Sequence, residues 1–178
     1  NTVAHLHRHV VDMVGVGVDF SQSLQLPAEV GAAPRTLFYP GSSIGNFTPA
    51  DAQAFLQRAR EASPGGNLLI GVDLVKAKPV LDAAYDDALG VTAAFNLNTL
   101  AHVNRLLGSN FALRQWRHVA FFDEARSRIE MHLEAREAVT VRWPGGERRF
   151  AAGEHIHAEN SCKYTVESFD ALLRRDAA

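Results

Sequence analysis

The sequence predicts an α/β protein in which a parallel sheet comes first and a smaller antiparallel lobe follows. Residues 36–74 read as strand, loop, helix and strand, and both strands are short apolar runs, as in a parallel sheet with a right-handed crossover. After about residue 110 the apolar residues alternate instead, most strictly over 128–134, which is typical of antiparallel strands. We therefore place a parallel domain at 1–107, an antiparallel lobe at 108–164 and a terminal helix at 165–178.

The strands of the parallel domain are expected in three places. Residues 1–9 read as the end of a helix, and the valine-rich run that follows predicts a strand around 13–18. Two further strands are expected at 36–39 and 67–74, because both are apolar and both are bounded by turn residues.

A helix between the last two strands has the clearest local signal. Thr48 is a suitable N-cap, Pro49 suits the first helical position and Asp51 follows three residues after the cap. Apolar residues at helical spacing predict the buried face, and a Ser-Pro-Gly-Gly stretch ends the helix: Ala52, Phe55, Leu56, Ala59 and residues 63–66.

The second half of the chain should contain two helices and then antiparallel strands. Gly90 is expected to separate a short helix from a longer one within 82–107, with Leu97 and Leu100 on the inner face. The remaining elements are a strand at 128–134, a strand with its turn at 139–146, an extended segment at 154–164 and a helix capped by Thr165 with Phe169, Leu172 and Leu173 inward.

Composition excludes several classes of protein. Apolar residues make up 47% and charged residues 21% of the chain, as in a globular protein. The net charge is −2 and no Lys/Arg run exceeds two residues, so we expect no nucleic-acid partner. No apolar run is long enough for a membrane span, and the single cysteine, Cys162, excludes an internal disulfide. We expect a cytoplasmic protein and, because the chain opens without Met inside an apparent helix, a piece of a longer one.

Candidate binding residues follow the predicted parallel strands, where open α/β sheets bind ligands. Asp19 could accept from an exocyclic amine and Phe20 could flank a base, although both could equally be structural. The loop 41–46 contains two glycines and small hydroxyls that could approach a carboxylate or phosphate, and Asn46 could orient an amine; a plain turn is the alternative.

A second candidate site lies near the end of the antiparallel lobe. His155, His157 and Glu159 alternate in an extended segment, so we expect them on one face with Ser161. The pattern could hold zinc or iron, but no further ligand stands at a fixed spacing, so we expect no metal. We favour Glu159 and Ser161 as hydrogen-bond partners of a polar ligand, with a solvent-exposed face as the alternative. Tyr85 could hold a ligand or belong to a surface acidic pair.

Four stretches, taken together, resemble the histidine-specific, S-adenosylmethionine-dependent Nα-methyltransferases of ergothioneine biosynthesis. They occur in the family's order with similar spacing: residues 37–47, 84–96, 128–131 and 159–164. The resemblance implies a partial Rossmann-like class I methyltransferase sheet with a small antiparallel α+β substrate lobe. It also implies methyl transfer from S-adenosylmethionine to the α-amine of L-histidine.

The resemblance assigns a role to each candidate residue. The adenine would lie at Asp19 and Phe20, and Gly41 and Ser42 would lie beside the cofactor near the reaction centre. Histidine would be held by its amino and carboxylate groups through Asn46 and Tyr85, and by its imidazole through Met131, Glu159 and Ser161.

The chain also departs from the family pattern. The Gly-rich first loop, which cradles the methionine part of the cofactor, and the ribose-binding acid of the second strand are missing. Three alternatives therefore stay open: a non-catalytic piece of such an enzyme, a methyltransferase for another amino acid, and a His-x-His-x-Glu metalloenzyme.

Overall fold

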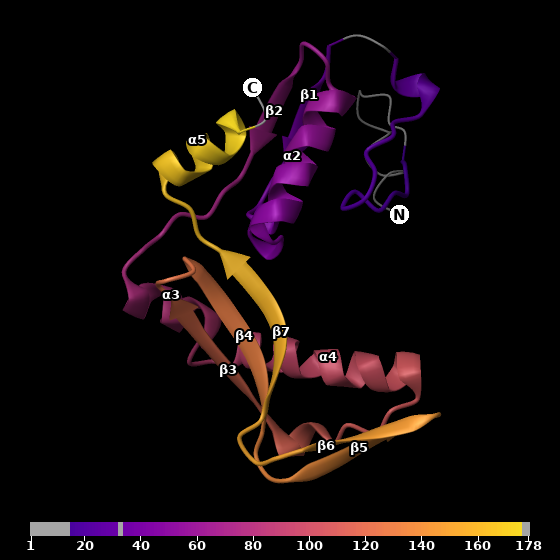
Figure 1. The fold of residues 1–178 in the computed structure, drawn as a ribbon, viewed down its shortest axis with the longest axis vertical. Helices are drawn as coiled ribbons and strands as arrows, with labels where there is room; N and C mark the ends of the chain where they lie inside the picture. The colour runs from indigo at the N-terminus through magenta and orange to yellow at the C-terminus, as the bar shows by residue number, and fades with distance from the viewer. Residues whose placement is uncertain (1–14, 32–33, 176–178) are drawn as a thin grey trace.

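The computed structural model describes residues 15–31 and 34–175 and shows an α/β protein with one parallel and two antiparallel sheets (Figure 1). Between the helices and strands lie three short 3₁₀ helices, η2 (Ala28–Val30), η3 (Ser43–Asn46) and η4 (Leu113–Gln115). The helices and strands are β1 (Thr36–Tyr39), α2 (Pro49–Ala62), β2 (Asn67–Ile70), α3 (Lys78–Tyr85), α4 (Val91–Leu107), β3 (Trp116–Asp123), β4 (Arg128–Ala135), β5 (Val139–Trp143), β6 (Gly146–Phe150), β7 (His155–Cys162) and α5 (Val166–Arg174).

The strand–helix–strand unit is confirmed. β1 and β2 pair in parallel with Thr36 opposite Asn67, and α2 connects them. The Thr48 hydroxyl accepts a hydrogen bond from the Asp51 backbone N–H at 3.2 Å, as expected of an N-cap. The buried residues of α2 are those that helical spacing predicted: Ala52, Phe55, Leu56 and Ala59.

The strand expected around 13–18 is not found in the part of the chain that the structure describes. Residues 13–14 and the helix end expected at 1–9 lie outside the described residues, and residues 15–18 belong to no strand. Val16 and Val18 are both exposed. Valine favours extended backbone, but a strand also needs a neighbour to pair with, and the described residues give this segment none.

The antiparallel half is built on a three-stranded sheet in the order β3-β4-β7, with the β5–β6 hairpin beside it (Figure 1). Helices α3 and α4 pack against this sheet: Leu81 contacts the cluster around Ile129, and Leu100 contacts Trp116 and Leu133. The sequence analysis grouped these helices with the parallel domain. In the structure their apolar faces pack on β3 and β4.

The last helix returns to the parallel half of the molecule (Figure 1). Leu172 of α5 is buried with Phe55 and Ile44, while Phe169 is partly buried against the same cluster. Leu173, which was expected to face inward, is 43% exposed because the neighbouring position 172 occupies the contact with α2. α5 begins at a capping box in which Thr165 and Ser168 bond reciprocally.

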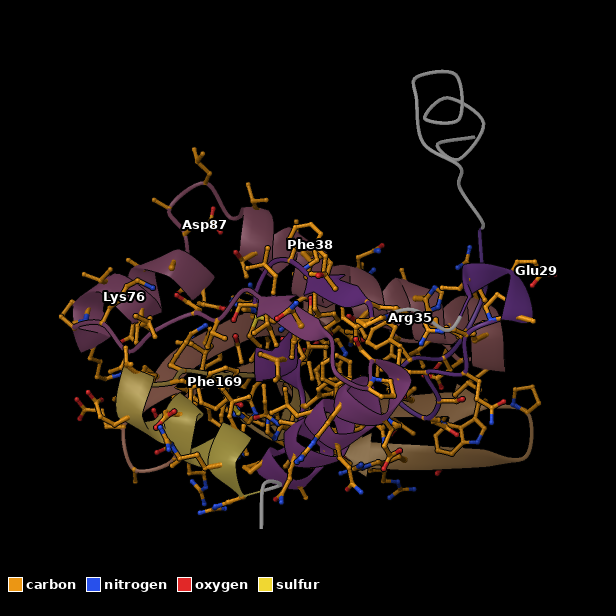
Figure 2. All side chains as sticks on the ribbon, turned by 90° about the horizontal axis from the view of Figure 1, so that it is seen from above. Glu29, Arg35, Phe38, Lys76, Asp87 and Phe169 are labelled. Carbon is orange, nitrogen blue, oxygen red and sulfur yellow. The ribbon has the colours of Figure 1, made fainter. Side chains whose placement is uncertain are left out.

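One face of the parallel sheet carries exposed apolar side chains. Tyr39 packs against Phe55 of α2, and strand alternation turns Phe38 to the opposite face, away from α2 (Figure 2). Phe38 is 68% exposed and Leu69, its partner on β2, is 61% exposed. Within the described residues no helix is both long and apolar enough to cross a membrane.

Candidate active site

The two halves of the molecule meet where η3 lies against the end of β7. Gly45 of η3 is buried, and a Cβ added to it would lie 2.8 Å from the Cys162 carbonyl oxygen and 3.5 Å from Ser161 Oγ. The Cys162 thiol points to the Phe47 carbonyl oxygen at 3.6 Å, and burial raises its pKa. The loop after β1 and the end of β7 are thus in direct contact, and only glycine fits between them.

This contact brings Asn46 to Glu159. The Asn46 side chain is hydrogen-bonded to the Glu159 carboxylate. Burial raises the pKa of Glu159, and the hydrogen bond from Asn46 offsets only part of that effect. Two residues 113 positions apart, each a separate candidate in the sequence, therefore belong to one cluster.

A second group of polar side chains gathers around Ser161. The Tyr85 hydroxyl, at the end of α3, lies 2.9 Å from Ser161 Oγ. The Lys163 ammonium donates to Tyr85 Oη at 2.7 Å and to Ser161 Oγ at 2.8 Å. It also lies 4.6 Å from the centre of the Tyr85 ring, over its face. No local sequence pattern links Tyr85 to Ser161 or to Lys163, because these residues lie 76 and 78 positions away from it.

Lys163 also links this group to the loop after β2. Its side chain is fully buried, and its ammonium lies 3.0 Å from Asp73 Oδ2. The Asp73 backbone N–H donates to Ser42 Oγ at 2.7 Å, so the same loop is tied to the loop after β1. Burial alone would raise the pKa of Asp73, but hydrogen bonds from Lys76 and Lys163 outweigh burial and hold that pKa below its usual range.

Gly41 shapes the loop after β1. Its φ of +72° lies in the left-handed region, which favours glycine. A Cβ added to Gly71, at the end of β2, would lie 2.1 Å from the Gly41 carbonyl oxygen, so the two loops approach backbone to backbone. The sequence-based expectation of a close backbone approach at Gly41 therefore matches the geometry, although the approaching group seen here is Gly71.

Asp19 and Phe20 lie at the edge of the aromatic cluster beside this loop. Phe20 meets the rings of Tyr39 and Phe47 edge-on, at centroid distances of 5.8 Å and 6.5 Å, and is 42% exposed. Asp19 is exposed and accepts hydrogen bonds from the backbone and hydroxyl of Ser21. Phe20 is thus held by its ring contacts and Asp19 by its hydrogen bonds to Ser21, and both side chains stay accessible to solvent beside β1.

Met131 is buried on β4, directly opposite Glu159. In an antiparallel ladder, opposite residues share a face, so Met131 lies under the carboxylate-bearing side of β7. It packs with Leu81 and Phe122 in the core. Met131, Glu159 and Ser161 therefore lie on the same face of this sheet.

The expected common face of His155, His157, Glu159 and Ser161 holds for Glu159 and Ser161 but is wrong for the two histidines. His157 pairs with His132, but Glu159 pairs with Met131, so Ala158 is an extra residue in a β-bulge. The bulge shifts the alternation by one residue and turns the two histidines to the opposite face from Glu159. A bulge of this kind leaves no signal in the alternation of residue types.

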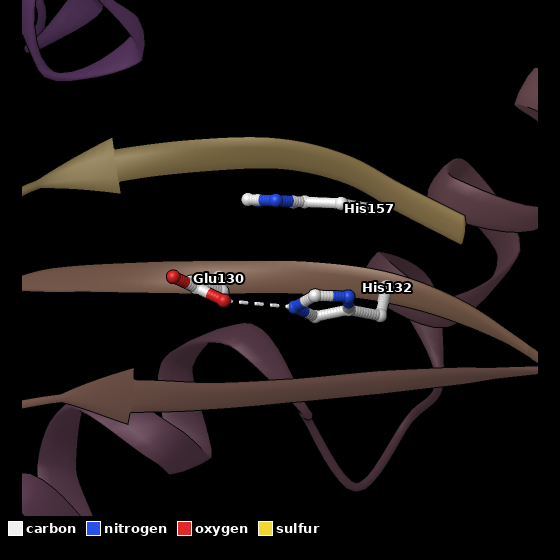
Figure 3. A group of neighbouring side chains, drawn as sticks. All are labelled: Glu130, His132 and His157. Atoms are coloured by element: carbon white, nitrogen blue, oxygen red, sulfur yellow. Dashed lines mark hydrogen bonds and ion pairs between the residues drawn. The ribbon is translucent and has the colours of Figure 1, made fainter. Parts of the chain in front are cut away.

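On that opposite face His157 joins Glu130 and His132 (Figure 3). Their potential ligand atoms lie within 4.8 Å of one another. The imidazole rings of His132 and His157 are stacked, with their centroids 4.5 Å apart and their planes at 22°. Glu130 already bonds Arg128 at 2.5 Å and His132 at 3.0 Å. This arrangement favours a stacked, ion-paired cluster over a metal site.

We expect this cluster to make the stability of the protein depend on pH. Burial lowers the pKa of His132; the hydrogen bond to Glu130 raises it, and His157 and His155 lower it further, for a net decrease. His132 of the unfolded chain therefore becomes protonated at about pH 6.5, whereas His132 of the folded protein becomes protonated only at lower pH. The free energy of unfolding therefore falls as the pH falls below about 6.5.

The measurement is urea unfolding of the full-length gene product between about pH 7.5 and about pH 5.5. A His132→Gln variant should lose part of the pH dependence that the wild type shows. His102→Gln, at an exposed position on α4, is the matched control and should keep the wild-type slope. Equal slopes for the wild type and His132→Gln would contradict this assignment.

Comparison with known proteins shows the family of the chain. A family model described as histidine-specific methyltransferase, SAM-dependent, matches residues 1–178. The chain belongs to this family. Histidine N-alpha-methyltransferase from Mycolicibacterium smegmatis is 44% identical over 166 residues, which are 92% of this chain and 51% of that protein. The chain spans about half the length of this protein and of the histidine N-alpha-methyltransferase from Mycobacterium tuberculosis, to which it is 41% identical.

Two further relatives share a lower identity with this chain. Ergothioneine biosynthesis protein 1 from Schizosaccharomyces pombe is 32% identical over 136 residues, 74% of this chain and 18% of that protein. N-methyltransferase imqF from Aspergillus flavus is 31% identical over 152 residues, 81% of this chain and 41% of that protein.

A surface hollow of the described part of the chain lies away from the cluster. It is lined by the end of α2, the turn before β2 and the end of α5. That is the amino end of β2, whereas Gly41, Asn46 and Asp73 follow the carboxyl ends of the strands. We place the candidate site at the carboxyl ends, because ligands of open α/β sheets bind there.

Proposed function

We propose that the protein containing this chain transfers methyl groups from S-adenosylmethionine to the α-amine of L-histidine, toward trimethylhistidine and ergothioneine. Membership of the histidine-specific family supports this activity. The observation that carries the proposal is the direct contact of η3 with the end of β7. It brings Asn46, the amine-binding candidate of one half, to Glu159 and Ser161, the imidazole-binding candidates of the other.

The residues assigned to the cofactor have fitting chemistry. Gly41 leaves open space beside its Cα, since an added Cβ would meet nothing closer than Ser43 Oγ at 4.0 Å. Phe20 offers an exposed ring surface that could stack on adenine, and the adjacent carboxylate of Asp19 could accept from the adenine amine. Ser42 would lie beside the bound cofactor. When bound, S-adenosylmethionine supplies an electrophilic methyl group on a sulfonium.

The residues of the chain would act by positioning the α-amine. Because the Asn46 amide is bonded to Glu159 as a donor, its carbonyl oxygen can accept an N–H of the amine and turn the nitrogen lone pair toward Gly41. The amine has to be neutral to react, and burial would favour that form. Orientation of two reactants can contribute about 7–11 kcal/mol in ideal cases.

The imidazole of histidine would lie over Met131, between Glu159 and the hydroxyl of Ser161. We assign Tyr85 to this end of the pocket, in place of the carboxylate contact that the resemblance implied, because its hydroxyl lies 2.9 Å from Ser161 Oγ. A ligand without the imidazole nitrogens would leave these buried polar groups without a partner, which is the physical basis of specificity.

We also propose that β1, α2, β2 and α5 are part of a Rossmann-like core, and that the segment from α3 to β7 is the substrate lobe. Two parallel strands alone make a marginal sheet. The exposed Phe38 and Leu69 support the proposal, because both faces of a parallel sheet are normally covered. Further strands and helices of the full-length protein would cover that face.

The test is transfer of labelled methyl from S-adenosylmethionine to L-histidine by the full-length gene product. We expect label in the α-amino group of histidine, located by mass spectrometry, and binding of histidine in calorimetry with S-adenosylhomocysteine present. Label transferred to a different amino acid, with none to histidine, would favour a methyltransferase of other specificity. Absence of all transfer would favour a non-catalytic protein.

A further inference from the structure

A buried lysine lies behind the two hydroxyls of the candidate site. The Lys163 ammonium is 2.7 Å from Tyr85 Oη, 2.8 Å from Ser161 Oγ and 3.0 Å from Asp73 Oδ2. An ammonium group has three N–H donors and accepts no hydrogen bond. These three oxygens therefore match the three donors of Lys163, and the ammonium has a fixed orientation in the core.

This arrangement determines which way the two hydroxyls can donate. Because Lys163 only donates, Tyr85 Oη and Ser161 Oγ must both accept from it. The two oxygens are 2.9 Å apart, so one hydroxyl donates to the other. Each hydroxyl has a single hydrogen. One hydrogen of the pair therefore remains, and it has to point away from Lys163, toward whatever occupies the site.

Glu159 adds a hydrogen-bond acceptor next to the donor that Tyr85 and Ser161 provide. It lies two residues before Ser161 on β7, and the register with Met131 and Ile129 places both on one face. As a carboxylate it only accepts. A ligand that hydrogen-bonds to all of these groups must donate one N–H to Glu159 and accept the remaining O–H of Tyr85 and Ser161. A neutral imidazole has one protonated and one unprotonated ring nitrogen and meets both requirements.

We propose that Lys163 is a specificity-determining positioning residue, which makes Tyr85 and Ser161 present a single hydrogen-bond donor so that the site binds the neutral imidazole ring of the substrate. The inference rests on the proposed function. Lys163 acts through the two hydroxyls and does not touch the substrate. Its bond to Asp73, whose backbone bonds Ser42, holds the same lysine against the loops that carry the candidate cofactor residues.

The test compares two ligands in the full-length gene product by calorimetry, with saturating S-adenosylhomocysteine. L-Histidine has both ring nitrogens, and 3-(2-thienyl)alanine has a ring of similar shape with neither. We expect Lys163→Met to weaken histidine binding by about tenfold or more, because the fixed donor is lost, and to change thienylalanine binding by less than about twofold.

Lys76→Met is the matched control. Lys76 is bonded to the same Asp73 but is exposed and bonds neither Tyr85 nor Ser161, so its loss should leave the preference for histidine unchanged. Equal weakening of both ligands in Lys163→Met would assign Lys163 a purely structural role and overturn the inference. A wild-type protein that binds thienylalanine as tightly as histidine would remove the proposed function, and the inference would fall with it.

A second set of variants leaves Lys163 in place, in case Lys163→Met does not fold. In Tyr85→Phe or Ser161→Ala alone, the remaining hydroxyl still accepts from Lys163 and can turn its hydrogen outward. Each single variant should lower the preference for histidine by less than about threefold, and the double variant by more than the product of the two. If one single variant loses as much as the double variant, the shared-donor arrangement is wrong.

Discussion

Replacing Gly45 by alanine is expected to slow methyl transfer by about 100-fold, because a misplacement of about 1 Å in an active site can have that effect. The added Cβ would lie 2.8 Å from the Cys162 carbonyl oxygen, so the backbone of η3 or of β7 has to shift. The two nearest atoms, the carbonyl oxygen and the nitrogen of Cys162, both belong to the backbone and not to a flexible side chain. The shift would separate Asn46 from Glu159 and the substrate amine from the bound methyl donor.

The measurement is the steady-state rate of the full-length gene product with histidine, together with its urea unfolding. Overpacking of this kind lowers stability by about 1–3 kcal/mol, so the protein should still fold. Gly17→Ala is the matched control, because an added Cβ there meets nothing within 4 Å. A Gly45→Ala enzyme with the rate of the wild type would show that the contact between η3 and β7 does not position the site.

Removing the carboxylate of Glu159 is expected to weaken histidine binding by about 5- to 150-fold. A buried N–H that loses its partner is destabilised by about 1–3 kcal/mol, which corresponds to that range. Glu159→Gln keeps the side-chain volume and an acceptor oxygen, so it should lose less than Glu159→Ala. The affinity for 3-(2-thienyl)alanine, which has no ring N–H, should change little in either variant.

Calorimetry with both ligands separates recognition from folding. Glu124→Ala, in the exposed turn between β3 and β4, is the control for a generic loss of charge and should bind histidine as the wild type does. A Glu159→Ala variant that keeps its preference for histidine over thienylalanine would contradict the role given to this carboxylate.

The sequence was informative where local chemistry decides structure. α2 has its cap, its first proline and its buried face where Thr48, Pro49 and the spacing of Phe55 placed them. The alternation over 128–134 predicted β4, and the break at Gly90 between two helices was confirmed. Such features depend on residues within one or two turns of each other, so a single sequence can reveal them.

The sequence was uninformative where distant segments meet. Lys163 contacts Tyr85 and Asp73, which are 78 and 90 positions away, and nothing in the local pattern of β7 marks the lysine as buried. The β-bulge at Ala158 places His157 and Glu159 on opposite faces of the sheet, and the alternation of residue types gives no sign of it. Residues 15–18, the described part of the strand expected around 13–18, form no strand for a related reason, since valine content does not supply a pairing partner.

The central claim is that Asn46 from one half of the molecule and Glu159 with Ser161 from the other hold the same small substrate. A crystal structure of the full-length protein with L-histidine and S-adenosylhomocysteine tests it most directly. We predict the α-amine within hydrogen-bonding distance of Asn46, and the two imidazole nitrogens bonded to Glu159 and to the hydroxyl pair of Tyr85 and Ser161. Histidine bound at another place, or with its imidazole turned away from β7, would contradict the claim.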